Sequence, residues 1–110
     1  MLNYQELYDK VNLCIDNMQY NAQPEGLYAP IKYVLDLGGK RIRPILMLMA
    51  YNLYKDRVED ILPNAIALET YHNFTLLHDD LMDRADMRRG HQTVHKKWDD
   101  NTAILSGDAM

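Results

Sequence analysis

The sequence predicts an all-α fold, and three observations support that prediction. Apolar residues recur at three- and four-residue steps through most of the chain, which is the period of an amphipathic helix. No segment alternates apolar and polar residues as a half-buried strand does. Glycine and proline are few, and several stand where apolar runs begin or end. With 110 residues, 47% of them hydrophobic, the chain forms one domain or part of one.

The first two helices are expected on either side of a loop at residues 21–26, which contain turn-forming residues. The first helix is predicted near residues 3–20. Its apolar face consists of Leu7, Val11, Cys14, Ile15 and Met18. The second helix covers the apolar pattern of residues 27–35. It is expected to end at Gly38-Gly39, because glycine is favoured just after a helix.

Two prolines indicate where the next helices begin. Pro44 fits the first turn of a third helix over residues 44–54, and residues 55–60 form a polar connection. Pro63 opens a long fourth helix over residues 63–86. Gly90 lies in a break, and residues 93–110 continue with one or two further helical pieces. Because the chain stops within such a piece, we expect it to be a fragment of a longer protein.

Four aspartates crowd the end of the fourth predicted helix: Asp79, Asp80, Asp83 and Asp86. At about 100° per residue, Asp79 and Asp83 lie about 40° apart, and Asp86 falls within about 20° of Asp79. Like charges at this spacing weaken a helix, and the C-terminal end of its dipole disfavours anions. A divalent cation reverses both effects, and magnesium prefers carboxylate oxygens and shares its shell with phosphates. The pattern therefore favours a magnesium site, with a solvated acidic surface as the alternative.

Two arginines, Arg88 and Arg89, follow the aspartates at once. A continued helix would place Arg88 on the side opposite Asp79, so we expect the chain to bend before Gly90. Two arginines beside metal-loaded carboxylates suit a ligand with several anionic oxygens. Simple neutralisation of the acidic cluster is the alternative.

A second basic cluster lies earlier, in GGKRIRP at residues 38–44, which offers Lys40, Arg41 and Arg43 before a helix start. Glycines let the backbone approach a ligand, and helix N-termini favour anions, so a phosphate clamp is plausible. A solvated basic loop is the alternative. His72 lies two helical turns before Asp79 and could donate a hydrogen bond to a phosphate, or be a satisfied core residue.

GGKRIRP and the stretch HDDLMDRADMRRG, at residues 78–90, together resemble the first half of a trans-isoprenyl diphosphate synthase of the polyprenyl synthetase family. The residues that match the family pattern are Lys40, Arg43, His72, Asp79, Asp83, Arg88 and Arg89. Residues 98–110 also resemble that family. The resemblance implies an isoprenoid-synthase-type helical bundle, with residues 1–110 as the N-terminal fragment of a single catalytic domain. The family's second aspartate-rich motif would lie beyond residue 110.

The resemblance also implies a reaction, the head-to-tail trans condensation of isopentenyl diphosphate with an allylic diphosphate, and Mg²⁺ as cofactor. It assigns the metal to Asp79 and Asp83, with Asp80 in support, and the allylic diphosphate to Arg88. The residues with catalytic roles are then Asp79, Asp80, Asp83 and Arg88. Those that would hold the diphosphate of isopentenyl diphosphate are Lys40, Arg43, His72 and Arg89. The family's usual assembly is a homodimer, and this fragment alone is expected to be inactive.

Product length is expected to depend on Phe74 and Thr75. Thr75 lies four residues before Asp79 and directly beneath it on the helix, whereas Phe74 lies about 140° off that face. The resemblance suggests that an aromatic residue five before the first aspartate limits growth to farnesyl or geranylgeranyl products. Core packing is the alternative role for Phe74.

Other function classes fit less well. A metal phosphohydrolase with a His-Asp dipeptide needs a further upstream histidine, and none precedes His72. A terpene cyclase shares the first aspartate motif, but the basic stretches GGKRIRP and RRG, as sites for a second diphosphate, argue against this class. A non-catalytic diphosphate-binding subunit of the same fold stays open. The net charge of −4 argues against nucleic acid, Cys14 alone suits a reducing cytoplasm, and the apolar run at residues 45–51 is too short to span a membrane.

Overall fold

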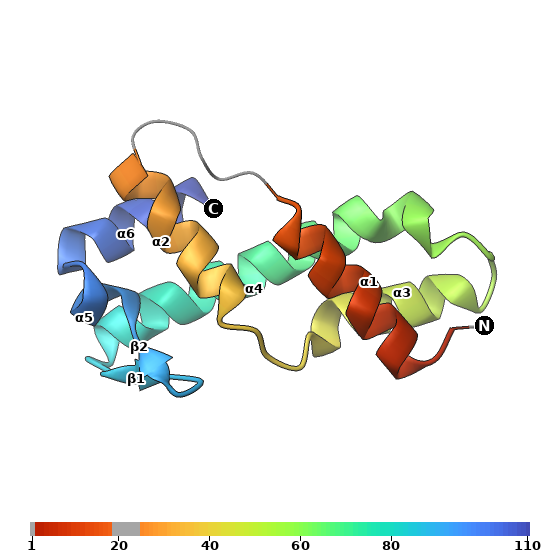
Figure 1. Ribbon diagram of the computed structural model, residues 1–110, viewed down its shortest axis with the longest axis horizontal. Helices are drawn as coiled ribbons and strands as arrows, with labels where there is room; N and C mark the ends of the chain where they lie inside the picture. The colour runs from red at the N-terminus through yellow and green to blue at the C-terminus, as the bar shows by residue number, and fades with distance from the viewer. Residues whose placement is uncertain (1, 19–24) are drawn as a thin grey trace. The chain divides into compact units, whose positions relative to one another are not determined.

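The computed structural model describes residues 2–18 and 25–110, and the regular secondary structure of these residues is helical apart from one small hairpin (Figure 1). In chain order the elements are α1 (Tyr4–Asp16), α2 (Glu25–Asp36), α3 (Ile42–Asn52), the 3₁₀ helix η1 (Val58–Ile61), α4 (Leu62–Met82), β1 (Met87–Arg88), β2 (His91–Gln92), α5 (Val94–Lys97) and α6 (Asp100–Ala109). The all-α prediction is confirmed for this part of the chain. No described helix combines the length and the apolar character needed to cross a membrane.

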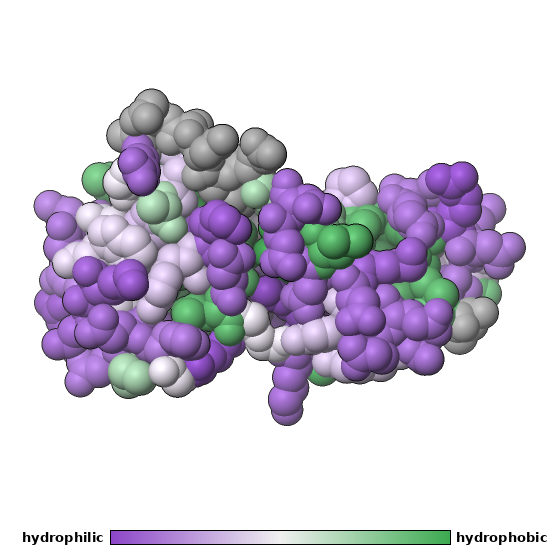
Figure 2. All heavy atoms as spheres, in the orientation of Figure 1, coloured by the Kyte–Doolittle hydropathy of each residue, from purple (hydrophilic) through white to green (hydrophobic). Residues whose placement is uncertain are grey.

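The chain divides into two units, which are described separately. The first unit comprises residues 1–18 and 40–70, and the second comprises residues 19–39 and 71–110. Helix α4 contributes its first half to one unit and its second half to the other. In both units the visible surface is mostly hydrophilic, with apolar side chains reaching it in places (Figure 2). Exposed large apolar residues include Leu13, Leu46, Leu53, Tyr71 and Leu105.

The first unit is built on the packing of α1 with α3. Asn3 and Glu6 form a reciprocal capping box at the start of α1, which satisfies two backbone N–H groups. Leu7, Val11 and Ile15, at four-residue steps, form the buried face of α1, as the sequence predicted. The helix ends at Asp16, earlier than predicted. Of the predicted loop at residues 21–26, residues 21–24 lie outside the described residues, and the prediction is wrong for Glu25 and Gly26, which belong to α2. The connection at residues 55–60 includes the start of η1, which the sequence did not indicate.

Pro44 lies in the first turn of α3, as predicted, and is buried there.

Helix α2 begins at Glu25, slightly before the predicted range, and ends before Gly38-Gly39. Both glycines have positive φ angles, of 82° and 122°, which explains why glycine is suited to this helix end.

The second unit has a core cluster contributed by four of its helices: Val34, Leu77, Val94 and Ala103. Helices α2 and α6 lie side by side (Figure 1), and the Ser106 hydroxyl of α6 donates a hydrogen bond of 2.7 Å to the Leu27 carbonyl of α2. Asp99 caps α6 by accepting the Thr102 N–H at 2.7 Å. Hydrogen bonding with Thr102, through its side chain first and its N–H second, lowers the pKa of the Asp99 carboxyl. The predicted helical pieces after residue 93 are thus confirmed as α5 and α6.

Helix α4 is shorter than predicted, and the end of it determines where the aspartates lie. The Ala85 N–H donates to the Asp80 carbonyl at 2.9 Å, and the Arg84 N–H donates to the Leu81 carbonyl at 3.2 Å. With Arg84 in the left-handed conformation (φ 55°), this is a Schellman motif. The prediction that the helix continues through residue 86 is therefore wrong, and Asp86 is not on the helical face of Asp79.

A hairpin follows, which the sequence analysis did not predict. Strands β1 and β2 pair antiparallel, with Arg88 opposite His91. The two turn residues, Arg89 and Gly90, both have positive φ angles, of 52° and 79°, as a type I′ turn requires. The predicted bend before Gly90 is confirmed, and it turns Arg88 back toward α4.

Candidate functional site

The four clustered aspartates fall into two kinds. Asp80 forms an ion pair with Arg88, and Asp86 forms one of 3.3 Å with Lys96. Asp79 and Asp83, by contrast, are exposed and make no ion pair with any residue that the structure describes. The Asp83 N–H still donates to the Asp79 carbonyl at 2.8 Å, so the two keep their four-residue helical relation. The pair without an internal counter-charge is the pair to which the family resemblance assigns a metal.

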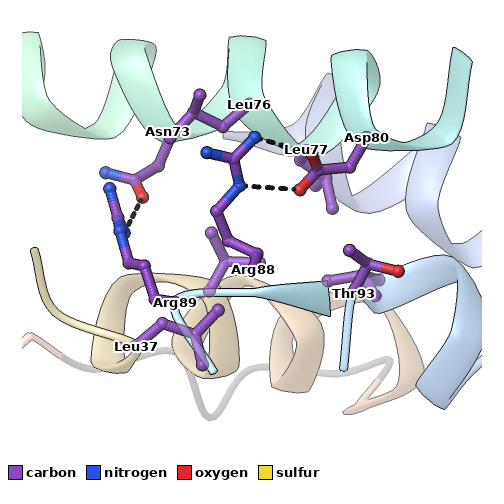
Figure 3. Close-up of a pocket in the computed structure, with 10 residues that line it drawn as sticks. Leu37, Asn73, Leu76, Leu77, Asp80, Arg88, Arg89 and Thr93 are labelled. Atoms are coloured by element: carbon purple, nitrogen blue, oxygen red, sulfur yellow. Dashed lines mark hydrogen bonds and ion pairs between the residues drawn. The ribbon is translucent and has the colours of Figure 1, made fainter. Parts of the chain in front are cut away.

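The pairing of Asp80 with Arg88 is bidentate and partly buried (Figure 3). Arg88 Nε and Nη2 donate to the two carboxylate oxygens of Asp80 at 3.0 and 2.6 Å. These bonds, more than the smaller attraction of Asp79, raise the pKa of the Arg88 guanidinium above its ordinary value. Arg88 therefore neutralises Asp80, and Asp80 in turn fixes the direction of the Arg88 guanidinium.

Arg89 points to a different part of α4 from Arg88 (Figure 3). Its Nη1 lies 3.5 Å from the Oδ1 of Asn73, a fully buried residue that the sequence analysis missed. A Cβ at Gly39 would lie 2.8 Å from the Arg89 Cζ, so the guanidinium rests against this glycine, whose φ of 122° also disfavours other residues there. A small pocket between Asp80, Arg88 and Asn73 has a volume of about 10 Å³, close to the least that holds one water molecule. It is too small for a substrate.

The basic cluster of the first unit separates into buried and exposed members. Lys40 and Arg43 are exposed. Arg41 is only 4% exposed, and its side chain is directed to Asn12 and to Glu69, which is itself 2% exposed. Of the three basic residues, the two exposed ones are those that match the family pattern. Lys40 and Arg43 belong to the first unit, and His72 and Arg89 to the second, so the structure describes each pair within its own unit.

Phe74, one of the two predicted chain-length residues, lies in a row of rings along α4. Its ring centroid is 5.6 Å from that of Tyr71 and 4.7 Å from that of His78, which it meets edge-on. Thr75 turns its hydroxyl back to donate to the His72 carbonyl at 2.6 Å. Phe74 therefore contacts the residue directly before the aspartates, a link that helical spacing of four residues could have indicated.

His78 connects this row of rings to α6. Its Nε2 lies 3.1 Å from the Ile104 carbonyl and 3.8 Å from the Asp108 carboxylate. Because the Ile104 oxygen can only accept, the Nε2–H tautomer is the one that donates there. A Cβ at Gly107 would lie 2.6 Å from the His78 Cδ2 and would also collide with Nε2. Gly107 is thus a packing requirement that the sequence analysis missed.

Gly107→Ala is expected to lower the free energy of unfolding by about 1–3 kcal/mol, the usual cost of forcing extra volume into a packed site. The matched control is Gly26→Ala, since a Cβ at that helical glycine meets nothing within 4 Å. The control should be neutral or stabilising by up to about 1 kcal/mol, because alanine favours helix. Urea unfolding of both variants measures the difference. Equal stability of the two variants would contradict the close contact with His78.

Two further observations bear on ligands. Among the described residues, no three His, Cys, Asp or Glu side chains gather closely enough to hold a metal by themselves. A larger hollow of about 610 Å³ lies along α2 and α6, with Leu27, Leu105 and Ser106 in its wall. None of the predicted site residues lines it.

Comparisons of the amino-acid sequence with a family model and with known proteins agree with one another. Residues 24–110 match the family model described as Polyprenyl synthetase. The geranylgeranyl diphosphate synthase of Methanosarcina mazei is 45% identical over 100 residues, which cover 91% of this chain and 31% of that protein. The short chain isoprenyl diphosphate synthase of Methanocaldococcus jannaschii is 48% identical over 91 residues, which cover 83% of this chain and 28% of that protein.

The solved structures agree. A crystal structure of a geranylgeranyl pyrophosphate synthase matches with a TM-score of 0.94 and 51% identity, over 99% of this chain and 33% of that one. The chain thus spans about a third of the length of these relatives. The predicted isoprenoid-synthase-type fold is confirmed over that part. Since the family model matches well over half of the chain, the chain belongs to the polyprenyl synthetase family.

Proposed function

We propose that residues 1–110 are the N-terminal part of the catalytic domain of a trans-prenyl diphosphate synthase, which joins isopentenyl diphosphate to an allylic diphosphate. The observation that carries this proposal is the division of the aspartates: Asp79 and Asp83 share a helix end without an internal counter-charge, beside an arginine that Asp80 holds in place. The relatives that are named as short-chain and geranylgeranyl synthases support it.

Asp79 and Asp83 fit Mg²⁺, because both offer exposed carboxylate oxygens, the ligands that this hard cation prefers. Two protein carboxylates are enough when substrate phosphates and water complete the coordination shell. When bound, the metal offsets the negative charge that builds on a leaving diphosphate. Asp80 stays paired with Arg88 and so acts by orienting that arginine.

Arg88 then stabilises the allylic diphosphate as its carbon–oxygen bond breaks. A guanidinium held in advance by Asp80 needs little reorganisation when charge develops, which is the condition for electrostatic catalysis. The double bond of isopentenyl diphosphate attacks the allylic carbon, and loss of a proton gives a product longer by one isoprene unit. The protein's main contributions are to orient the two substrates and to keep water from the reactive carbon.

For isopentenyl diphosphate we propose that Lys40, Arg43, His72 and Arg89 bind the diphosphate, each as a donor to anionic oxygens. Phe74 is proposed to limit product length to the farnesyl or geranylgeranyl range. We further propose that the protein is a cytoplasmic homodimer. The competing function is a diphosphate-binding subunit that does not catalyse condensation, and the assay below separates the two.

The proposed function is tested by incubating the full-length protein that contains these residues with Mg²⁺, dimethylallyl diphosphate and labelled isopentenyl diphosphate. Labelled prenyl diphosphates are the expected product. Diphosphate binding without any product would instead favour the non-catalytic subunit.

Residues 1–110 alone are expected to give a helical circular dichroism spectrum and negligible condensation. They supply one of the two aspartate-rich motifs that the family resemblance implies, and they expose apolar side chains such as Leu46 and Leu105. The same assay, run side by side with the full-length protein, measures this. Robust turnover by residues 1–110 would show that the site model is wrong.

A further inference from the structure

Arg41 stands between the two exposed basic residues of the first unit and differs from both in conformation and burial. It is the residue before α3, and its backbone is left-handed, with φ 56° and ψ 34°. Only a few per cent of residues other than glycine have a positive φ, and such a conformation persists where the surroundings over-determine it. The contacts of Arg41 identify those surroundings.

Three side chains from two other helices hold this segment. Arg41 Nε donates a hydrogen bond of 3.0 Å to Asn12 Oδ1 on α1, and Arg41 Nη1 lies 3.7 Å from Glu69 Oε1 on α4. The Tyr4 hydroxyl, at the start of α1, donates a hydrogen bond of 2.6 Å to the backbone carbonyl of Lys40. We define these residues, Tyr4, Asn12, Arg41 and Glu69, as the anchor cluster.

Fold stability alone does not account well for the anchor cluster. Both charged members are almost fully buried, at 4% and 2% exposure, and desolvation offsets much of the attraction in such a pair. What the cluster does determine is direction. With the Arg41 side chain drawn inward and the Lys40 carbonyl fixed, the side chains of Lys40 and Arg43 are both left at the surface.

We propose that the anchor cluster positions Lys40 and Arg43 for a diphosphate, so that Tyr4, Asn12, Arg41 and Glu69 are positioning residues of the isopentenyl diphosphate site. This inference rests on the function proposed above. A site whose donors are held in place before binding loses less conformational entropy when the ligand arrives, so the anchor cluster acts on affinity. It should act far less on the chemical step, which takes place at the allylic diphosphate.

Tyr4→Phe is the sharpest test, because it removes one hydroxyl from a partly exposed side chain and leaves the ring. In the full-length protein, the KM for isopentenyl diphosphate should rise about threefold to tenfold, the effect of one lost hydrogen bond. The kcat and the KM for the allylic diphosphate should stay within about twofold. Tyr8→Phe is the matched control, since Tyr8 stacks on Tyr4 one turn along and no hydrogen bond from its hydroxyl to a described residue is found.

Glu69→Gln provides a second variant, which keeps the side-chain length and removes the charge. We expect a larger rise in the same KM, with thermal unfolding measured in parallel. The proposal is overturned if each variant raises the KM for isopentenyl diphosphate and the KM for the allylic diphosphate by the same factor. It is also overturned if the variants lower only the melting temperature, because the anchor cluster is then purely structural.

A binding measurement separates this proposal from the proposed function. Calorimetric titration with inorganic diphosphate in excess chelator reports on basic residues without metal at the aspartates. Weaker binding by Tyr4→Phe than by Tyr8→Phe supports the anchor cluster. This holds even if the wild-type protein makes no product, because the absence of product would overturn only the synthase assignment. Equal binding by the two variants, or no binding by either, overturns the anchor cluster.

Discussion

Asp79→Ala is expected to lower condensation turnover of the full-length protein by about 10²-fold or more, the usual cost of removing a group that stabilises developing charge. Asp79 is exposed, keeps its helical relation to Asp83, and makes no ion pair with a described residue. Its carboxylate is therefore available to Mg²⁺. Because alanine favours helix and removes a repulsive charge, helical content should be nearly unchanged.

The measurement compares initial rates and circular dichroism of wild type, Asp79→Ala and Asp56→Ala. Asp56 is an exposed aspartate in the connection before η1, so its replacement controls for the loss of a surface charge. Excess chelator should abolish the wild-type rate and leave the Asp79→Ala rate little changed. Full activity of Asp79→Ala, or of the wild type in chelator, would refute the metal role.

Phe74→Ala is expected to shift the product distribution to longer chains. The ring is half-buried between Tyr71 and His78, and the proposed growing chain would meet it below the aspartates. Removing it opens space along α4. The stability cost should be about 3 kcal/mol at most, since fully buried phenylalanines lose about 3–5 kcal/mol on truncation.

Product chromatography of wild type and Phe74→Ala, primed with farnesyl diphosphate, measures the shift. Leu77→Ala is the control, because it removes a core side chain of the same helix that packs with Val34 and Val94 instead of with the row of rings. It should lose stability without lengthening the product. An unchanged distribution in Phe74→Ala would exclude this residue from the pocket. A wild-type product much longer than geranylgeranyl would refute the short-chain assignment.

Helices were predictable from the sequence because their cause is local. Leu7, Val11 and Ile15 repeat at the helical period and are buried together, and Pro44 marks the first turn of α3. Helix ends were less predictable. Arg84 adopts a left-handed conformation that glycine or asparagine usually adopts at a helix end. The residue type therefore did not indicate that α4 ends near Arg84. The same holds for the hairpin, whose turn is Arg89-Gly90 instead of Asn-Gly.

The sequence was enough to predict which residues form the candidate site, but not which of them pair with one another. The sequence identified the aspartates and arginines, but whether Arg88 meets Asp80 or Asp79 depends on the hairpin. Arg41 looked equivalent to Lys40 because its burial depends on Asn12 and Glu69, far away in sequence. One signal was available: Glu69 lies within the apolar run of α4, where a charged residue usually needs a buried partner.

We propose that the acidic end of α4 binds a metal ion that holds a diphosphate. Calorimetric titration of the full-length protein with an unreactive allylic thiolodiphosphate, with Mg²⁺ and in chelator, measures this binding. Binding should be tight with Mg²⁺, at least about tenfold weaker in chelator, and insensitive to Mg²⁺ in the Asp79→Asn, Asp83→Asn double variant. Equal affinity of the wild-type protein with and without Mg²⁺ would contradict the claim.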